Sequence, residues 1–351
     1  WNGELVWKYQ TNGTIESSPA VVDGKVFIGS NDGYVYCLDS YSGYCIWKTY
    51  VNSELPMNFG AVVMLRSSPA VVKEIVYIGS VDGNLYALDV NNGNVLWKYE
   101  TGGIITSSPT VADGAVYFTS EEPTEGALYK VKSSDGALIW RKAIGYLEPF
   151  TGGTDMQCTP TVAGGMVFVS TNVMEYYGIN ASTGETVWTY NNPAATEFIV
   201  STPIYVNGEL FIVDKFDIAC LNAKTGDKIR SSYSGDELYV APSYADGKIY
   251  VVTSQRRIFI ISAVNGDVLT YTNTASASWS SPTLVDGNLY IGNNDWNIYC
   301  FTTSRSSEGS SNQGNSHESL DDYVYALVGL ATVVVVVAAV YVYSRSRKTD
   351  E

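Results

Sequence analysis

The stretch "SSPAVVDGKVFIGSNDGYVYCLDSYSGYCIW", residues 17–47, decides the fold because residues 67–97 read almost the same, "SSPAVVKEIVYIGSVDGNLYALDVNNGNVLW". Self-similarity at a fixed period is typical of repeat proteins. Seven anchor prolines mark the copies, six of them in Ser-Pro or Thr-Pro pairs: Pro19, Pro69, Pro109, Pro160, Pro203, Pro242 and Pro282. A basic unit of about 40 residues fits one blade of a β-propeller.

Each repeat predicts four short strands. The first opens at the anchor proline, which an edge strand tolerates because the missing N–H breaks no ladder hydrogen bond. Asp-Gly pairs such as Asp23-Gly24 then predict a tight hairpin turn. The second strands, such as "IVYIG" and "MVFVS", are almost entirely apolar, which is typical of strands buried on both faces between stacked blades. The fourth strand is expected to end in tryptophan.

A glycine in the turn before the fourth strand and a tryptophan four residues later keep one spacing. The pairs are Gly43 and Trp47, Gly93 and Trp97, Gly136 and Trp140, and Gly184 and Trp188. The fifth and sixth copies carry Arg230 and Thr270 in the tryptophan position, and the seventh stops at Phe301 after three strands. Gly3 and Trp7 keep the same spacing, so we predict an all-β, seven-bladed propeller over residues 1–301, closed by the N-terminal strand.

The composition excludes several functions. The formal net charge of -15 disfavours nucleic-acid binding, since affinity for phosphates depends on clustered Lys and Arg. The single histidine, His317, lies in a Ser/Gly/Asn-rich stretch outside the repeats. The predicted propeller therefore offers neither Ser-His-Asp nor Cys-His catalysis, nor zinc held by histidine.

The C-terminal part predicts a membrane anchor. Residues 323–343, "YVYALVGLATVVVVVAAVYVY", carry no charge and are long enough to span a bilayer as a helix. Tyrosines at both ends and the basic tail at 344–351 place the C-terminus in the cytoplasm. The propeller is then extracellular, joined by a flexible linker at 302–322. The first residue is Trp1, which suggests that a signal peptide has been removed. We expect a single-pass protein of the cell membrane.

The cysteines and two sequons give weaker signals. Cys37, Cys220 and Cys300 share one position in the third strand and are expected to be small buried residues. Cys37 and Cys45 flank one hairpin turn, so a disulfide between them is the alternative in an extracellular setting. Asn12-Gly-Thr and Asn180-Ala-Ser are candidate glycosylation sites, with chance matches as the alternative.

The units "GSVDGNLYALDVNNGNVLW" and "GSNDGYVYCLDSYSGYCIW" resemble the repeats of the pyrroloquinoline quinone (PQQ) family of quinoprotein alcohol dehydrogenase-like propellers. The resemblance covers residues 1–301. Its non-catalytic branch includes the BamB-type subunit of the bacterial outer-membrane assembly machine. The resemblance implies that five tryptophans dock neighbouring blades on one another: Trp7, Trp47, Trp97, Trp140 and Trp188.

The resemblance carries no catalytic residues across. Enzymes of the family use a vicinal cysteine pair over the quinone, a calcium ion held by carboxylate and amide ligands, and usually eight blades. Here no two cysteines are adjacent, seven repeats are counted, and no segment matches the metal-site pattern. We expect no cofactor and no enzymatic activity. A PQQ-dependent dehydrogenase with quinone and calcium is the weaker alternative.

Long connections are expected to gather on one face. They follow Trp47, Trp140 and Trp188, and a fourth, "EEPTEG", joins the second and third strands of the third repeat. In a four-stranded blade these two types of connection leave from the same face. Apolar side chains on such loops indicate a partner site. The candidate partner-binding residues are Leu55, Met57, Phe59, Tyr146, Phe150 and Phe198.

These observations together favour a non-enzymatic, membrane-anchored binding or scaffolding propeller at the cell surface. Its expected partners are a protein or a polysaccharide of the cell envelope, with no role for nucleic acid. The second alternative is a structural surface protein that packs against copies of itself.

Overall fold

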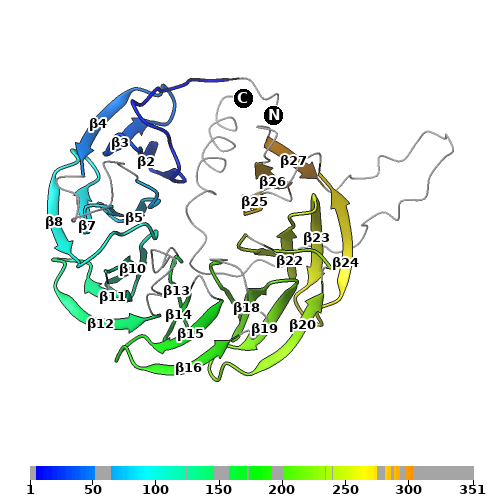
Figure 1. Ribbon diagram of the computed structural model, residues 1–351. Helices are drawn as coiled ribbons and strands as arrows, with labels where there is room; N and C mark the ends of the chain where they lie inside the picture. Colours follow the sequence, from blue (N-terminus) through cyan, green and yellow to red (C-terminus); the bar gives the residue numbers. More distant parts are fainter. Residues whose placement is uncertain are drawn as a thin grey trace, which may run out of the picture.

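The computed structural model describes residues 5–51, 65–123, 125–145, 158–171, 174–191, 201–233, 235–238, 240–274, 281–285, 288–292 and 298–302. These residues form seven antiparallel sheets, six with four strands and one with three. The sheets follow one another around a ring, with β4, β8, β12, β16, β20 and β24 along its circumference (Figure 1). The prediction of an all-β fold built from repeated blades is confirmed.

Each blade is one sheet whose strands pair in chain order. The first holds β1 (Ala20–Val22), β2 (Lys25–Gly29), β3 (Tyr34–Asp39) and β4 (Cys45–Tyr50). The second holds β5 (Ala70–Val72), β6 (Ile75–Gly79), β7 (Asn84–Asp89) and β8 (Val95–Glu100). The third holds β9 (Thr110–Ala112), β10 (Ala115–Glu121), β11 (Gly126–Lys132) and β12 (Leu138–Ile144). The fourth holds β13 (Thr161–Ala163), β14 (Met166–Ser170), β15 (Glu175–Asn180) and β16 (Thr186–Asn191).

The remaining blades follow the same order. The fifth holds β17 (Ile204–Val206), β18 (Glu209–Asp214), β19 (Asp217–Asn222) and β20 (Lys228–Tyr233). The sixth holds β21 (Ser243–Ala245), β22 (Lys248–Val252), β23 (Arg257–Ser262) and β24 (Val268–Asn273). The seventh holds β25 (Thr283–Val285), β26 (Asn288–Gly292) and β27 (Ile298–Thr302).

Local chemistry sets the first hairpin of each blade. Asp23 and Gly24 both have positive φ, 48° and 73°, which is the backbone of a type I′ turn. Val22 therefore pairs with Lys25, and the strand register leaves Phe27 opposite Ala20. Phe27 is fully buried, so the turn places the apolar side chains of the second strand between two blades.

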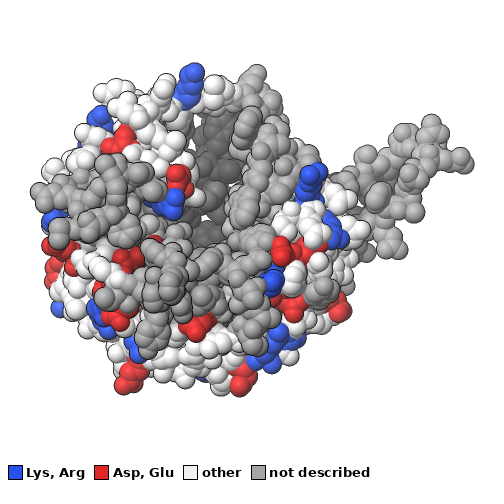
Figure 2. All heavy atoms as spheres, viewed as in Figure 1, with Lys and Arg blue, Asp and Glu red and all other residues white. Residues whose placement is uncertain are grey.

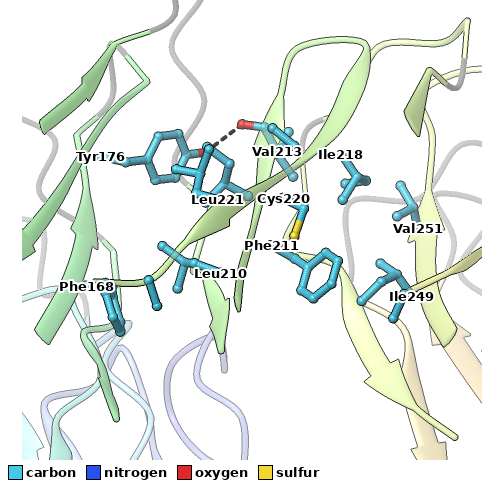
Figure 3. Close-up of a cluster of buried hydrophobic side chains, with 14 of the residues drawn as sticks. Phe168, Tyr176, Leu210, Phe211, Val213, Ile218, Cys220, Leu221, Ile249 and Val251 are labelled. Atoms are coloured by element: carbon cyan, nitrogen blue, oxygen red, sulfur yellow. Dashed lines mark hydrogen bonds between the residues drawn. The ribbon is translucent and has the colours of Figure 1, made fainter. Parts of the chain in front are cut away.

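The hydrophobic core lies between neighbouring blades. One cluster joins Phe27 and Trp47 of the first blade to Val76 and Leu88 of the second. Figure 3 shows the corresponding core of the fifth blade, with Leu210 and Leu221 toward the fourth blade and Phe211 and Ile218 toward the sixth. Second strands such as β14 are buried at every position, as the apolar runs predicted.

Hydroxyl groups tie the innermost strands together. The backbone N–H of Ser18 donates to Ser68 Oγ (2.8 Å), and that of Ser68 donates to Ser108 Oγ (3.0 Å). Further round the ring, Thr110 Oγ1 donates to the Pro160 carbonyl (2.6 Å) and Thr161 Oγ1 to the Pro203 carbonyl (2.7 Å). The next residue in this series follows Pro203. It is Ile204, which has no hydroxyl to donate.

The tryptophans do not end the fourth strands, contrary to the expectation. Trp47 lies in the middle of β4, which continues to Tyr50. The strand bulges just before it, because Cys37 pairs with Trp47 whereas Leu38 pairs with Cys45. The same shift occurs in all six four-stranded blades, so the repeat encodes a bulge that turns the tryptophan toward the next blade.

The N-terminal strand that was expected to close the ring is not found among the described residues. Residues 5–10 form no strand, and β27 has no fourth partner among the residues that the structure describes. Trp7 nevertheless packs on the first blade and donates from Nε1 to the Ser40 carbonyl (2.9 Å). The described N-terminal residues therefore make the tryptophan contact that a preceding blade would make, but they do not pair with β27 as a strand.

Candidate binding face

Backbone hydrogen bonds fix which connections share a face. The N–H of Val51, just after β4, donates to the carbonyl of Gly33 in the turn between β2 and β3 (2.9 Å). The same bond links Thr101 to Gly83 (2.8 Å) and Thr274 to Arg256 (2.8 Å). In these three blades, the chain leaving the fourth strand thus lies against the second-to-third turn of its own blade. We call this side of the ring the candidate binding face.

The six predicted partner-binding residues lie outside the described residues: Leu55, Met57, Phe59, Tyr146, Phe150 and Phe198. The core residues that flank the first two of their three connections are described. Val51 and Leu65, on either side of residues 52–64, belong to one core cluster. Ile144 and Cys158, on either side of 146–157, belong to another. Both long connections therefore begin and end at anchors in the core of the ring.

The lengthened connection of the third blade is held by an ion cluster. Arg141 Nη2 lies 2.6 Å from Glu122 Oε2 and 2.6 Å from Glu125 Oε1. The Tyr129 hydroxyl donates to Glu122 as well, and burial together with this bond raises the pKa of Tyr129. One guanidinium thus pins Glu122 and Glu125, two of the three carboxylates of the "EEPTEG" segment, to the outer strand of the blade.

Carboxylates of other blades on this face are held by phenols. Tyr36 donates to Asp32 Oδ2 (2.6 Å), and Tyr86 donates to Asp82 Oδ2 (2.5 Å). Burial alone would raise the pKa of Asp32, but the bonds from Tyr36 and from backbone N–H groups lower it on balance. The sequence analysis missed these pairs, although both of the first two repeats carry Asp with Tyr four residues later.

The fifth blade departs from this pattern. Asp214 and Asp217 pair directly across a two-residue turn, and Asp214 Oδ2 accepts from the Tyr190 hydroxyl (2.9 Å) and Lys228 Nζ (3.3 Å). Asp214 Oδ1 and Asp217 Oδ1 are buried and have no protein partner. Burial raises the pKa of Asp217 most, and the nearby Asp214 adds to the effect. This corner brings two carboxylates together, and Lys228 offsets part of their charge.

The described surface mixes both signs of charge. Figure 2 shows Asp and Glu interspersed with Lys and Arg around the ring, without a broad basic area in view. In this view the described atoms therefore present no surface suited to a polyanion.

The five expected docking tryptophans contact the next blade in the same way. Their Nε1 groups donate to backbone carbonyls: Trp7 to Ser40, Trp47 to Val90, Trp97 to Ser133, Trp140 to Ala181 and Trp188 to Ala223. A Cβ on Gly136 would lie 2.6 Å from the ring of Trp97, so glycine is needed where the rings approach. These residues join blades rather than face a ligand.

Arg230 takes the tryptophan position between the fifth and sixth blades. Its guanidinium donates to the Ala263 carbonyl, which corresponds to the carbonyls that the tryptophans use. It also pairs with Glu209, Nη1 to Oε1 at 2.8 Å, and lies 5.6 Å from the ring centroid of Phe211. Sequence reasoning recognised the substitution but did not foresee that the hydrogen bond to the next blade is kept.

The cysteines are free thiols, so the disulfide weighed between Cys37 and Cys45 is absent. Cys37 is opposite Trp47 and Cys45 opposite Leu38, which places the two side chains in different clusters on the two faces of the blade. Cys220 is buried as expected, but Cys300 is exposed because β27 has no outer neighbour among the described strands.

The two sequons differ in structure. Asn12 is exposed in the segment before β1. Asn180 ends β15, and its Oδ1 accepts from the backbone N–H of Ser182 (2.9 Å) and Thr183 (3.1 Å). Asn222 makes the same turn contacts in the fifth blade. The Asn180 sequon therefore coincides with a turn that the repeat requires.

The residues present do not fit the quinone site of the family's enzymes. The three buried cysteines lie in different blades, so no vicinal pair exists to cover a quinone. Within the described ranges, no group of three or more His, Cys, Asp or Glu side chains is arranged to hold a metal ion. No helix of the described part is long and apolar enough to cross a membrane, and residues 323–343 lie outside that part.

A ring of bulged, tryptophan-docked blades defines a propeller of PQQ-type repeats. The sequence matches the family described as outer membrane protein assembly factor BamB over residues 1–122 and 101–309, and the chain belongs to this family.

Individual relatives agree with the assignment. The chain is 29% identical over 320 residues to outer membrane protein assembly factor BamB of Escherichia coli strain K12, covering 86% of this chain and 78% of the relative. It is 26% identical over 268 residues to tetrathionate hydrolase of Acidithiobacillus ferrooxidans, covering 72% of this chain but 52% of the hydrolase, about half its length. The crystal structure of BamB from Moraxella catarrhalis has the same fold, with a TM-score of 0.69 at 18% identity over 85% of this chain and 88% of that one.

Proposed function

We propose that this protein is a non-enzymatic scaffolding propeller of the cell envelope that binds a protein or polysaccharide partner through the candidate binding face. The observation that carries the proposal is the family match, which spans the whole ring. The family, and relatives such as the protein of Escherichia coli, are named as assembly factors. The absence of a residue set that fits the quinone chemistry of related enzymes favours binding over catalysis.

The binding face itself is supported by how its long connections are built. Two of the long connections start and end at core residues, as Val51 and Leu65 do, so the ring can present them without losing packing. Phe59 and Phe150 are the aromatic residues that we expect to anchor a partner, since a few buried aromatic side chains carry most binding energy.

The proposal includes anchoring by the apolar segment at 323–343, with the propeller outside the cell and the C-terminus in the cytoplasm. The uncharged segment followed by basic residues supports this orientation. It also includes closure of the ring by the N-terminal residues, supported by the docking of Trp7 on the first blade.

Cross-linking on intact cells with a membrane-impermeant reagent tests site and topology together. The full-length protein should capture a partner, and Phe59→Ser combined with Phe150→Ser should capture about tenfold less while melting normally. Phe27→Ser combined with Phe168→Ser is the matched control, because both rings are fully buried and their loss should lower the melting temperature instead. Equal capture by the loop variant would exclude this face, and capture only after permeabilisation would exclude the orientation.

A further inference from the structure

The chain leaves the ring on the side opposite the candidate binding face. A third strand starts at the second-to-third turn of its blade, so it ends on the opposite side. β27 is the last described strand, and its end, Thr302, pairs with Asn288 at the start of β26. The same position in the first blade is Asp39, where the turn to β4 begins. We call the side that carries these third-to-fourth turns the exit side.

The tip of the third-to-fourth turn can be compared among the six four-stranded blades. In four blades the tip is polar and exposed, and these residues are Asn91, Ser134, Ser182 and Lys224. In the first and sixth blades it is Tyr41 and Val264, 58% and 82% exposed. Tyr44, 73% exposed, follows the turn of the first blade at the position where the second blade has Asn94. Because the repeats share one backbone, the fold does not require these apolar side chains.

The two blades with apolar tips are the neighbours of the seventh blade in the ring (Figure 1). The tips of the second to fifth blades, which lie farther from the seventh, are polar. Tyr41 and Val264 therefore stand on either side of the blade from which the chain continues beyond Thr302. We call Tyr41, Tyr44 and Val264 the exit-side tips.

The turns that carry the exit-side tips are ordered. Asp39 Oδ1 accepts from the backbone N–H groups of Tyr41 (3.1 Å) and Ser42 (2.8 Å). In the sixth blade the N–H of Gly266 donates to the Ser262 carbonyl (2.9 Å), which closes the turn around Val264. The apolar side chains are thus exposed on fixed turns.

A lipid surface is the occupant that the chain itself brings to the exit side. Residues 303–322 separate Thr302 from the proposed anchor at 323–343. A flexible linker of about 20 residues spans roughly 25 Å, which holds the exit side close to the bilayer. Tyrosine suits the membrane–water interface because its ring is apolar and its hydroxyl is polar. Because the tether makes the contact intramolecular, a weak contact is enough to be populated.

We propose that the exit-side tips rest on the lipid surface of the membrane that holds the anchor. The inference rests on the anchoring in the proposed function and deepens it, because it states how the ring is oriented. With the exit side on the membrane, the candidate binding face points away from the bilayer toward partners of the envelope.

The test uses the full-length chain in phosphatidylcholine nanodiscs that contain a lipid with a nitroxide on its headgroup. A fluorescent label is attached through Asn265→Cys, beside Val264, or through Thr183→Cys as the matched control. Both positions are exposed and follow the turn tip of their blades, but Thr183 lies in the fourth blade, far from the seventh. Cys45→Ser and Cys300→Ser remove the thiols that would also react, since the other three cysteines are buried. The nitroxide should quench the label at 265 more than the label at 183.

The decisive variant combines Tyr41→Asn, Tyr44→Asn and Val264→Asn, which installs the residue type that the second blade carries at Asn91 and Asn94. The tether stays intact in this variant, so it separates contact by the tips from mere nearness of the seventh blade. Quenching at 265 should fall to the level at 183, whereas quenching at 183 should not change. The melting temperature should stay that of the parent, because the three side chains are exposed.

Co-elution of the protein with the nanodiscs reports the anchor separately. If the protein co-elutes but the two labels are quenched equally, the tips do not rest on lipid and only this inference is overturned. Unchanged quenching at 265 in the triple variant would overturn it as well and would leave the exit-side tips to a protein partner. If the protein does not co-elute, the proposed anchoring fails and the inference fails with it.

Discussion

The junction between the fourth and fifth blades and the junction between the fifth and sixth use the same backbone but different side chains. At the first, Trp188 packs against Phe168 and donates to the Ala223 carbonyl (2.9 Å). At the second, Arg230 lies over Phe211 and donates to the Ala263 carbonyl. The innermost strands differ too, since Thr161 reaches the Pro203 carbonyl but Ile204 has no hydroxyl to donate.

The comparison separates what the repeat requires from what it prefers. Both junctions keep a planar group packed against an aromatic ring and one hydrogen bond to the next blade. Tryptophan supplies these through a large apolar surface, whereas arginine needs Glu209 to balance its charge. Arg230 Nε has no partner although it is buried, so the arginine is the less complete solution.

The largest expected effect comes from removing the two docking side chains. Trp188→Ala should lower the free energy of unfolding by about 3 to 5 kcal/mol, the usual loss for a buried tryptophan. Arg230→Ala should lower it by about 1.5 to 3 kcal/mol, the scale of hydrogen bonds to a charged group. Urea unfolding of both variants measures the difference. If Arg230→Ala proves the more harmful, the arginine junction is not the weaker one.

Two glycines of the third blade allow the steric clash with tryptophan to be measured separately from the backbone strain of the turn. Gly114 and Gly136 both have φ of 73°, but a Cβ would meet nothing within 4 Å at Gly114 and the Trp97 ring at 2.6 Å at Gly136. Gly114→Ala should therefore cost about 1 to 2 kcal/mol for the left-handed backbone alone. Gly136→Ala should cost about 1 to 3 kcal/mol more, because the ring must move. Equal melting temperatures of the two variants would mean that the Trp97 side chain moves aside at no cost in stability.

The fold was predictable because its signals are local and repeated. The Asp23-Gly24 turn fixes a register, and the apolar second strands such as β14 fix which residues lie between blades. The bulge was not predictable, since the spacing from Gly43 to Trp47 is compatible with a strand that ends at the tryptophan. Cys300 was misjudged because burial in a third strand depends on a fourth, which β27 lacks among the described strands.

The site was less predictable than the fold. The bond from Val51 to Gly33, which recurs in other blades, agrees with the predicted proximity of the two types of connection, whereas the course of the long connections stays a prediction. The partner-binding residues on those connections, Phe59 among them, stay a prediction. The contact between Tyr34 and Tyr50 was missed because the two residues are far apart in the sequence, and only strand pairing brings them together.

The seam between the first and seventh blades extends the comparison to a third junction. Deleting residues 1–10 removes Trp7 and Tyr9, which pack against the first blade. We expect a loss below the 3 to 5 kcal/mol of a fully buried tryptophan, about 2 kcal/mol, because Trp7 is half-buried. The truncated protein should also aggregate more readily, because loss of Trp7 and Tyr9 exposes the apolar side chains of the first blade that they cover. Unchanged melting and light scattering would show that these residues do not close the ring.

The smallest expected effect is a dependence on pH that only the arginine junction should show. The hydrogen bond from Arg230 lowers the pKa of Glu209 from its ordinary value of 4.5. A carboxyl group with a lowered pKa contributes stability above its unfolded pKa and loses it as the pH falls through its folded pKa. The stability gap between the parent and Glu209→Gln should therefore be complete at neutral pH and should shrink below about pH 4.5. Trp188 has no titratable partner in its hydrogen bond, so the gap between the parent and Trp188→Ala should stay constant over the same range. Urea midpoints of the three proteins at neutral and acidic pH measure both gaps, and a Glu209→Gln gap that does not change with pH would show that the ion pair adds nothing to the junction.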